Sequence, residues 1–280
     1  MYLRKPDWLK TKLQSNEQFV KVNQIVKKHN LHTICSSGKC PNMSECWNKG
    51  TATFMILGDI CTRSCRFCNT HTGRPLPPDS NEPIQVAESV NLMKLCHAVI
   101  TSVDRDDLQD GGAKHWAETI RAIKRLNPTT TLEVLIPDFD GKTGLLDLLI
   151  AESPNIISHN LETVRRLTPS IRSKAKYEKS LSVLSYIASQ NIVAKTGIML
   201  GLGETHDEVV TLMDDALSAG CKILTIGQYM QPSSKNIPVS EYITPEKFEE
   251  YRQIALSKGF IKVESAPLVR SSYCAENHVM

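Results

Sequence analysis

Three cysteines within eight residues are the part of this sequence best suited to chemistry. Cys61, Cys65 and Cys68 follow the apolar run Phe54–Leu57 at spacings of four and three residues. Three thiolates in one tight loop can bind three irons of a cubane iron–sulfur cluster, and no fourth Cys follows as it does in bacterial ferredoxins. The fourth iron would therefore be open to another ligand. A zinc site or a group of buried thiols is the alternative, but structural zinc wants four ligands, usually in two C-x-x-C-like pairs.

The spacing of these cysteines resembles a known signature. C-x-x-x-C-x-x-C with an aromatic residue, here Phe67, before the last Cys is similar to the motif of radical S-adenosylmethionine (SAM) enzymes. The resemblance implies that SAM chelates the open iron through its amino and carboxylate groups. It also implies that the reduced cluster cleaves SAM to a 5′-deoxyadenosyl radical.

Length, composition and charge indicate which classes of protein the chain could belong to. The chain has 280 residues, of which 41% are hydrophobic and 22% charged, as in ordinary globular domains. The net charge of +3 and the lack of a basic stripe give no reason to expect a nucleic-acid partner. No apolar stretch reaches the roughly 18 residues of a membrane span, and the amino terminus is charged. We therefore expect a soluble, cytoplasmic protein with no membrane partner.

The cysteines also point to a reducing compartment. Six of the nine lie between residues 35 and 68. Crowded thiols in an unexported chain are more often metal ligands or catalytic groups than disulfides.

The first 47 residues are expected to comprise a helical extension and a loop. Residues 1–30 are expected to form a helical extension, in which Ser15 caps a helix with apolar positions from Phe19 to Val26. The segment Leu31–Trp47 is rich in Ser, Gly, Pro and Asn and is expected to be a loop.

From residue 54 onward, apolar runs alternate with helical patterns, which is the order of βα units with a parallel sheet. The expected strands are Phe54–Gly58, Ala98–Val103, Thr131–Pro137, Ile156–Asn160, Val193–Leu200 and Ile223–Met230. The expected helices lie near 83–96, 113–126, 143–152, 178–190, 206–219 and 245–258. Six strands predict an α/β fold, a partial (β/α)6 barrel, whose functional groups lie at the carboxyl ends of the strands.

A second set of three cysteines narrows the function. Cys35, Cys40 and Cys46 are spaced C-x4-C-x5-C and are followed by Trp47. Two neighbouring three-thiolate sets suggest two clusters with separate tasks, because one open iron suffices for SAM. Both sets together resemble the lipoyl synthase family, as do the segments Val99–Leu108, His159–Val164, Met199–Thr205 and Gly227–Tyr229. The resemblance runs from about residue 31 to Ala275.

The family resemblance implies a reaction and its participants. Octanoate in amide linkage to a lysine of a carrier domain or H-protein loses one hydrogen at C6 and one at C8 to deoxyadenosyl radicals from two SAM molecules. An auxiliary [4Fe-4S] cluster, held by the second cysteine set, supplies both sulfurs and is consumed. The resemblance also implies an electron donor such as ferredoxin or flavodoxin, and an iron–sulfur carrier for cluster repair.

The carboxyl-terminal segment Arg270–Tyr273 extends this resemblance. It implies that Ser272 ligates the fourth iron of the auxiliary cluster. A serine oxygen is a harder ligand than thiolate and could be released as the cluster is consumed. Arg270 could organise the cluster by charge. The plain alternative is that Ser271 and Ser272 make turn hydrogen bonds.

Several strand-end residues could contact SAM. Gly197, Met199, Gly201 and Glu204 fit the family's G-x-I-x-G-x-x-E pattern with Met in place of Ile, and glycines allow close backbone approach. An ordinary strand-to-helix turn would explain the glycines equally well. By position, Ser102, Asn160 and Glu162 are weaker candidates.

Other reactive residues receive simpler interpretations. The charged turn Asp104–Asp107 could be a solvated helix start. Cys96, on an apolar helical face, and Cys221, before a strand, are expected in the core. Cys274 is treated as a bystander. The residues His29, His71, His97, His115, His206 and His278 show no ligand spacing.

Three parts are expected: an extension with the auxiliary cysteines (1–50), the barrel (51–258) and a carboxyl-terminal extension (259–280).

Three other functions remain open from sequence. A methylthiolating radical SAM enzyme would carry a nucleic-acid module, an electron-transfer or metal-storage protein would not bind SAM, and a zinc-stabilised protein would be colourless.

Overall fold

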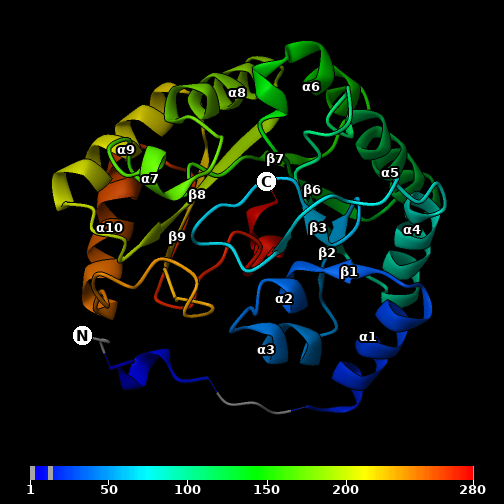
Figure 1. The fold of residues 1–280 in the computed structure, drawn as a ribbon, viewed down its shortest axis with the longest axis horizontal. Coiled ribbons are helices and arrows are strands. Elements are labelled where there is room, and N and C mark those ends of the chain that lie inside the picture. The colour runs from blue at the N-terminus through cyan, green and yellow to red at the C-terminus, as the bar shows by residue number, and fades with distance from the viewer. Residues whose placement is uncertain (1–3, 12–14, 280) are drawn as a thin grey trace. The chain divides into compact units, whose positions relative to one another are not determined.

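The structure is a computed structural model that describes residues 4–11 and 15–279. Figure 1 labels the helices and strands of the chain. The chain divides into two compact units. Unit 1 comprises residues 1–10, 64–68 and 157–273, and unit 2 comprises residues 11–63, 69–156 and 274–280. The boundary passes through the loop of the first cysteine set, because Cys61 belongs to unit 2 whereas Cys65 and Cys68 belong to unit 1.

Unit 2 contains four neighbouring strands in the order β1-β2-β5-β6. Strands β2, β5 and β6 are parallel, and β1 pairs with β2 in the antiparallel sense. The bounds are β1 (His32–Thr33), β2 (Thr53–Ile56), β5 (His97–Ser102) and β6 (Thr131–Leu135). All four residues of β2 are buried, as expected of a parallel strand covered on both faces. A separate parallel pair, β3 (Ile60–Cys61) and β4 (His71–Thr72), brackets the first cysteine set in the sequence.

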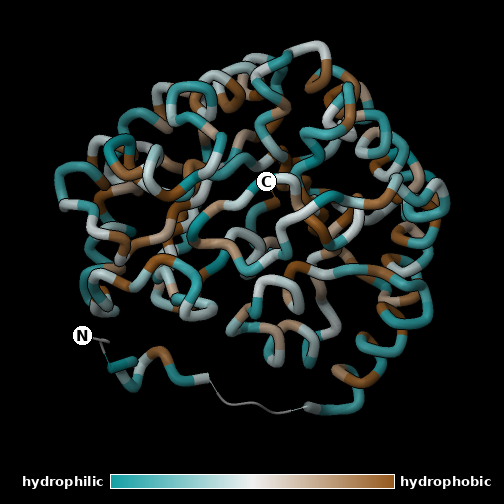
Figure 2. Tube along the Cα trace, viewed as in Figure 1, coloured by the Kyte–Doolittle hydropathy of each residue, from teal (hydrophilic) through white to brown (hydrophobic). Residues whose placement is uncertain are grey.

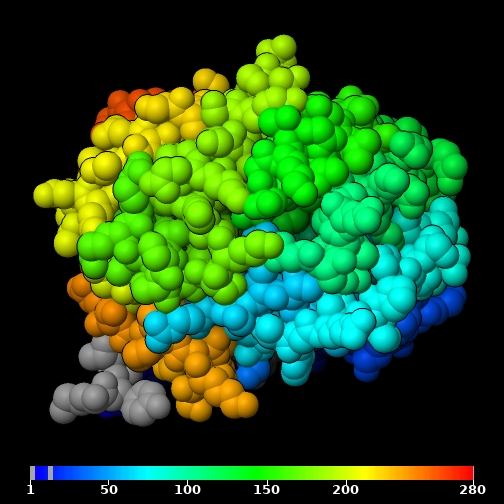
Figure 3. All heavy atoms as spheres, turned by 45° about the horizontal axis from the view of Figure 1, so that its top comes forward, coloured from blue at the N-terminus to red at the C-terminus, as the bar shows by residue number. Residues whose placement is uncertain are grey.

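Helices cover the sheet of unit 2. They are α1 (Glu17–Lys28), α2 (Ile34–Ser37), α3 (Met43–Asn48), α4 (Glu82–Met93), α5 (Ala113–Leu126) and α6 (Thr143–Ile150), with the 3-10 turns η2 (Phe139–Gly141) and η3 (Ala275–His278). Figure 2 shows apolar and polar residues alternating along α4 and α5, as an amphipathic helix requires. Figure 3 shows the outer side of these elements in cyan and green. The apolar stripe of α5 includes Trp116, Ile120 and Ile123, which are fully buried.

Unit 1 has the strand order β7-β8-β9-β10, with β8, β9 and β10 parallel. The bounds are β7 (Ile156–Ser158, whose first residue belongs to unit 2), β8 (Val193–Leu200), β9 (Ile223–Gln228) and β10 (Lys262–Ser265). The helices are η1 (Asp7–Leu9), α7 (Thr168–Ile171), α8 (Tyr177–Ser189), α9 (His206–Ser218) and α10 (Pro245–Lys258). Helix α9 begins with a capping box between Thr205 and Glu208, and α10 begins with the cap Thr244 followed by Pro245 at its first position.

The six predicted strands and six predicted helices all occur. Strand β8 and helices α5 and α10 have the predicted bounds. Two local predictions are wrong. Helix α1 is capped by Asn16 rather than Ser15, since the Asn16 side chain accepts from the Phe19 N–H. The segment 31–47, expected to be a loop, contains α2 and much of α3. The division into residues 1–50, 51–258 and 259–280 stays a prediction.

A buried glutamate fixes the turn that leads into the first cysteine set. Leu57 has a positive φ of 68°, and its N–H donates to Glu82 Oε2 at 2.7 Å. The same oxygen lies 2.6 Å from His115 Nε2 on α5. Glu82 and His115 are both buried. One carboxylate therefore joins the end of β2 to helices α4 and α5.

We predict that Glu82→Ala lowers the free energy of unfolding by about 2–4 kcal/mol, because it leaves a buried N–H and a buried imidazole without their acceptor. Urea denaturation measures this loss. Glu118→Ala, at an exposed position on α5, is the matched control and should denature like the wild type. Equal midpoints for the two variants would contradict the role assigned to Glu82.

Candidate metal centre and cofactor site

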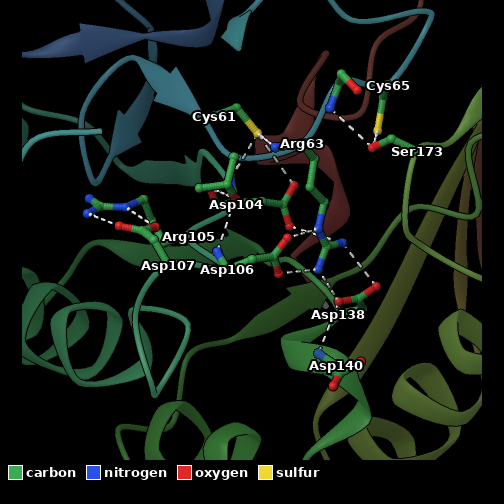
Figure 4. Close-up of polar contacts among 12 residues, drawn as sticks. Cys61, Arg63, Cys65, Asp104, Arg105, Asp106, Asp107, Asp138, Asp140 and Ser173 are labelled. Atoms are coloured by element: carbon green, nitrogen blue, oxygen red, sulfur yellow. Dashed lines mark hydrogen bonds and ion pairs between the residues drawn. The ribbon is translucent and has the colours of Figure 1, made fainter. Parts of the chain in front are cut away.

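The Cys61 sulfur is held by backbone donors within unit 2. Cys61 ends β3 and is 9% exposed. Its Sγ accepts the N–H groups of Arg63 and Asp104, each at 3.4 Å (Figure 4). N–H bonds to cysteine sulfur stabilise a thiolate and tune the potential of a cluster that it ligates. The environment of Cys61 is therefore suited to an iron ligand.

Two residues beyond Cys61, the side chain of Arg63 is clamped by three carboxylates. Its Nε and Nη2 donate to the two oxygens of Asp106, both at 2.9 Å. Its Nη1 and Nη2 donate to Asp138 at 3.1 and 2.8 Å, and Nη1 lies 3.2 Å from Asp104. Burial alone would lower the pKa of Arg63, but the hydrogen bonds to Asp106 and Asp138 raise it above its usual value. This buried cation ties the cysteine loop to the segments after β5 and β6 (Figure 4).

The turn Asp104–Asp107 is therefore not a solvated helix start. Arg105 is 2% exposed, and its guanidinium contacts both oxygens of Asp107 at 2.9 Å. Arg105 also donates to the carbonyl of Leu57 at 3.3 Å. Helix α5 begins only at Ala113. The acidic turn is part of the framework around Cys61.

The other two cysteines of this set are positioned within unit 1. Cys65 Sγ lies 3.6 Å from Ser173 Oγ, which also accepts the Ser64 N–H at 3.1 Å. Asn236 Nδ2 donates to the carbonyl of Cys68 at 2.8 Å. Ser173 and Asn236 were not identified from the sequence, where each is an isolated polar residue outside any motif.

Phe67 anchors the same loop by packing. Its side chain contacts a cluster of buried residues formed by Ile171, Leu202 and Tyr229. The partly buried Met199 packs on the same cluster. The aromatic residue before the last Cys therefore has a structural task.

The second cysteine set lies within unit 2. Cys35 lies in α2, which Thr33 caps by accepting the Ser36 N–H at 3.3 Å, and Cys46 lies in α3. Cys40 stands between them, and its N–H donates to the Cys35 carbonyl at 3.0 Å. The two short helices thus carry the outer cysteines of the set.

These thiols interact with one another. Burial and the neighbouring Cys40 raise the pKa of Cys35 to about 11, although a hydrogen bond from the Thr53 backbone opposes the rise. Burial, followed by Cys35 and Cys40, raises the pKa of Cys46 to about 12. Three adjacent thiolates repel each other unless a cation neutralises them, so the donor set suits an iron cluster.

A site for a single metal ion and a site for an iron–sulfur cluster need different arrangements of ligands. Within residues 4–11 and 15–279, no three His, Cys, Asp or Glu side chains converge closely enough to share a metal ion. A cubane cluster makes a different demand, because each thiolate binds its own iron.

The candidate SAM contacts Asn160 and Glu162 meet at the ends of β7 and β8 in unit 1. Asn160 is 7% exposed, and its Nδ2 donates to Glu162 Oε1 at 3.1 Å. Among the described residues, nothing donates to the buried Oδ1 of Asn160. Glu162 has a positive φ of 67°, and burial raises its pKa against the attraction of Arg172. An acceptor and a carboxyl side chain thus lie side by side near Gly197.

The glycines of the G-x-I-x-G-x-x-E pattern are required by the packing of the chain itself. A Cβ on Gly197 would lie 2.4 Å from Thr225 Oγ1 and 2.9 Å from Asn160 Oδ1. Gly201 has a φ of 95°, and its added Cβ would lie 2.2 Å from Gln228 Nε2. Glu204 accepts the N–H of Gly201 at 2.5 Å. A SAM role for Gly197, Met199, Gly201 and Glu204 stays a prediction.

The carboxyl-terminal motif approaches the same strand ends. Asn160 Nδ2 donates to Ser271 Oγ at 2.6 Å. Arg270 Nη1 donates to the Val269 carbonyl at 2.6 Å, and the Arg270 carbonyl accepts the Tyr273 N–H at 2.9 Å in a turn. Ser272 is half-buried. The bond to Ser271 comes from a remote side chain and is not the turn or backbone hydrogen bond of the plain alternative, which stays a prediction.

Three remaining predictions concern Ser102, Cys221 and Cys96. Ser102 ends β5 in unit 2, and no described residue hydrogen-bonds its buried Oγ. Cys221 is 1% exposed, as predicted, and burial raises its pKa to about 12. The prediction for Cys96 is wrong: Cys96 is exposed, because α4 ends at Met93 with Lys94 in the left-handed conformation. None of the nine cysteines, all of which lie in the described residues, is in a disulfide.

Comparison with known proteins identifies the relatives of the chain. The model of the radical SAM superfamily matches residues 55–216. Lipoyl synthase of Parabacteroides distasonis is 69% identical over 278 residues, covering 99% of each chain. Lipoyl synthases of Bacteroides fragilis and Treponema denticola are 65% and 59% identical, each covering 99% of this chain and 96% of the relative.

Solved structures show the same fold at low identity. Methylornithine synthase superposes with a TM-score of 0.59 at 9% identity, covering 85% of this chain and 74% of that one. Coproporphyrinogen III oxidase of Escherichia coli, a radical SAM enzyme, gives 0.52 at 12% identity, covering 79% and 56%. The predicted α/β fold of the radical SAM type, with a mostly parallel sheet, is confirmed.

We predict that Arg63→Met lowers the free energy of unfolding by about 3–5 kcal/mol, because it leaves the buried carboxylate of Asp138 without its cation. Denaturation of the cluster-free protein measures this directly. Arg121→Met, which removes a largely exposed partner of Glu152, is the matched control and should leave the midpoint near that of the wild type. A wild-type midpoint for Arg63→Met would contradict the clamp.

Proposed function

Because this chain belongs to the lipoyl synthase family of the radical SAM superfamily, we propose that it inserts sulfur at C6 and C8 of a protein-bound octanoyl-lysine. The chain is a radical SAM sulfurtransferase. The single observation that carries the finer proposal is the second thiol set, in which Cys35, Cys40 and Cys46 interact within unit 2. One cluster suffices to bind SAM, so a second donor set supports a separate source of sulfur.

The first cysteine set and its neighbours would hold the radical-generating cluster and SAM. A cluster on Cys61, Cys65 and Cys68, with SAM on its open iron, supplies the radical that an unactivated C–H bond requires. Backbone N–H groups orient Cys61, and the buried Arg63 clamp fixes the chain beside it. The surrounding barrel side chains would keep water away from the reacting carbon.

Residues at the strand ends would bind SAM. The unpaired Oδ1 of Asn160 could accept a ribose hydroxyl, and Glu162 lies beside it. The part of the site that contacts the nucleoside of SAM would be formed by Gly197, Met199, Gly201 and Glu204. Ser102 would add a hydroxyl group to the site. This assignment follows the family pattern, and the internal contacts of the glycines are compatible with it.

The auxiliary cluster, bound by Cys35, Cys40, Cys46 and Ser272, would be the sulfur-donating substrate. Serine oxygen matches soft iron–sulfur chemistry less well than thiolate, which supports its release as the cluster is consumed. Arg270 lies two residues from Ser272 and would place positive charge nearby. We propose two [4Fe-4S] clusters and two SAM molecules per lipoyl group.

Partners follow from this chemistry. The substrate is an octanoylated carrier domain or H-protein. A ferredoxin or flavodoxin would reduce the clusters, and an iron–sulfur carrier would rebuild the auxiliary one. Among the helices of residues 4–11 and 15–279, none has the length and apolar character needed to cross a bilayer. Six of the nine cysteines lie between residues 35 and 68, and crowded thiols of this kind favour a reducing compartment, so we propose the cytoplasm.

We predict that replacing Cys35, Cys40 and Cys46 together with Ala lowers the iron content of the reconstituted protein from about eight to about four per chain. Deoxyadenosine should still form from SAM, whereas lipoyl product should fall below detection, because the sulfur source is lost. Iron and sulfide analysis with Mössbauer spectra and product mass spectrometry measure this. A variant that retained all its iron, or still made lipoyl peptide, would show that the division of tasks is wrong.

We predict that octanoyl-lysine within a carrier protein or peptide is converted at least ten times faster than free octanoate, since remote binding contacts position the reacting carbons. Single-turnover assays with the three substrates test this. Equal rates for free octanoate would contradict the requirement for a lysine-bearing partner.

A further inference from the structure

The serine pair of the carboxyl-terminal motif has two different surroundings. Ser272 is the proposed cluster ligand, whereas Ser271 accepts a 2.6 Å hydrogen bond from Asn160 Nδ2. The same Nδ2 group donates to Glu162 Oε1 at 3.1 Å. Asn160 therefore has both amide hydrogens directed at Ser271 and Glu162, which turns its Oδ1 away as a free acceptor.

Glycines on two strands make room for this tail segment. A Cβ on Gly197 of β8 would lie 3.3 Å from Ser271 Oγ, besides its closer contacts with Thr225 and Asn160. A Cβ on Gly227 of β9 would lie 2.0 Å from the Val269 carbonyl oxygen and 3.3 Å from Arg270 Nη1. Two separate strands thus lack side chains where residues 269–271 approach. The position of the tail is therefore a built-in feature of unit 1.

We propose that Ser271 is a positioning residue that couples SAM binding at Asn160 and Glu162 to the placement of Ser272 on the auxiliary cluster. This inference rests on the proposed function of the same site. Consecutive Cα atoms are held about 3.8 Å apart, so a hydrogen bond that fixes Ser271 restricts where Ser272 can reach. SAM bound to Asn160 Oδ1 would fix the amide, and the amide would fix Ser271.

Thermodynamic linkage makes this coupling reciprocal. If SAM stabilises the tail position from which Ser272 binds iron, then Ser272 ligation must tighten SAM binding by the same factor. One neutral hydrogen bond of ordinary strength corresponds to roughly a three- to tenfold change in affinity. Ser271 would thus let the enzyme sense, at the SAM site, whether the auxiliary cluster is intact.

The test compares Ser271→Ala with Ser182→Ala in the fully reconstituted enzyme. Ser182 is the matched control, because its exposed hydroxyl donates only to the Glu178 carbonyl one turn earlier, at 3.0 Å. Two quantities are measured: the dissociation constant of SAM, and the Mössbauer parameters of the serine-ligated iron with and without SAM. The second readout would not move if Ser271 merely stabilised the fold.

We expect Ser271→Ala to keep both clusters, to bind SAM three- to tenfold more weakly, and to lose the SAM-induced change in the auxiliary spectrum. The control should behave as the wild type in both measurements. Unchanged SAM affinity in Ser271→Ala would overturn the proposal. Weaker SAM binding with an unchanged spectral response would also overturn it, because Ser271 would then serve the SAM site alone.

Different results would refute the proposed function and the coupling through Ser271. A wild-type enzyme that held only one cluster, or did not bind SAM, would refute the proposed function. A wild type with two clusters and tight SAM binding, alongside a Ser271→Ala variant identical to Ser182→Ala, would refute only the coupling.

Discussion

The buried guanidinium of Arg63 is the interaction on which the framework of unit 2 depends most. It joins the chain after Cys61 to Asp104 and Asp106 beyond β5 and to Asp138 beyond β6. A lysine could not replace it, because only a planar guanidinium offers paired donors to several carboxylates at once. These strand ends are where the parallel-sheet architecture collects functional groups. The clamp acts two residues from Cys61, the first cysteine of the set, and so restricts the backbone that carries this thiol.

A second constraint is the mutual repulsion of neighbouring thiolates. The structure places Cys35, Cys40 and Cys46 on two short helices and the turn between them, where burial and adjacent thiols raise the pKa of Cys35 and Cys46. Short helices have little stability of their own. The segment would therefore gain stability from the cluster that we propose it binds, and its two short helices are separate from the strands of unit 2. The sulfur of Cys61, in contrast, is held within unit 2 by two backbone N–H donors.

The periodicity of the sequence was enough to predict the βα units, and helix α5 and strand β8 were predicted to the residue. It missed β10, whose exposed Lys262 and partly buried Glu264 obscure a strand of four residues. It also misplaced Cys96, because nothing marks Lys94 as the left-handed end of α4. The cysteine spacing predicted the two thiol sets, but the partners that fix them are remote. Arg63 and Asp138 are 75 residues apart, and no local pattern relates them.

The G-x-I-x-G-x-x-E pattern shows why a motif and its physical cause must be separated. Sequence alone suggested that its glycines admit a nucleoside, yet the structure shows Gly197 packed against Thr225 and Asn160 and Gly201 packed against Gln228. Glu204 likewise accepts backbone N–H groups of its own turn. The motif therefore first builds a strand end against which other parts of the chain can lie closely. Beside these glycines, the amide oxygen of Asn160 is buried and accepts no hydrogen bond from a described residue, while its Nδ2 donates to Glu162 and to Ser271 of the carboxyl-terminal segment. The strand ends of unit 1 therefore pack against the carboxyl-terminal segment as closely as against one another, and a change in that segment should alter the surroundings of Asn160.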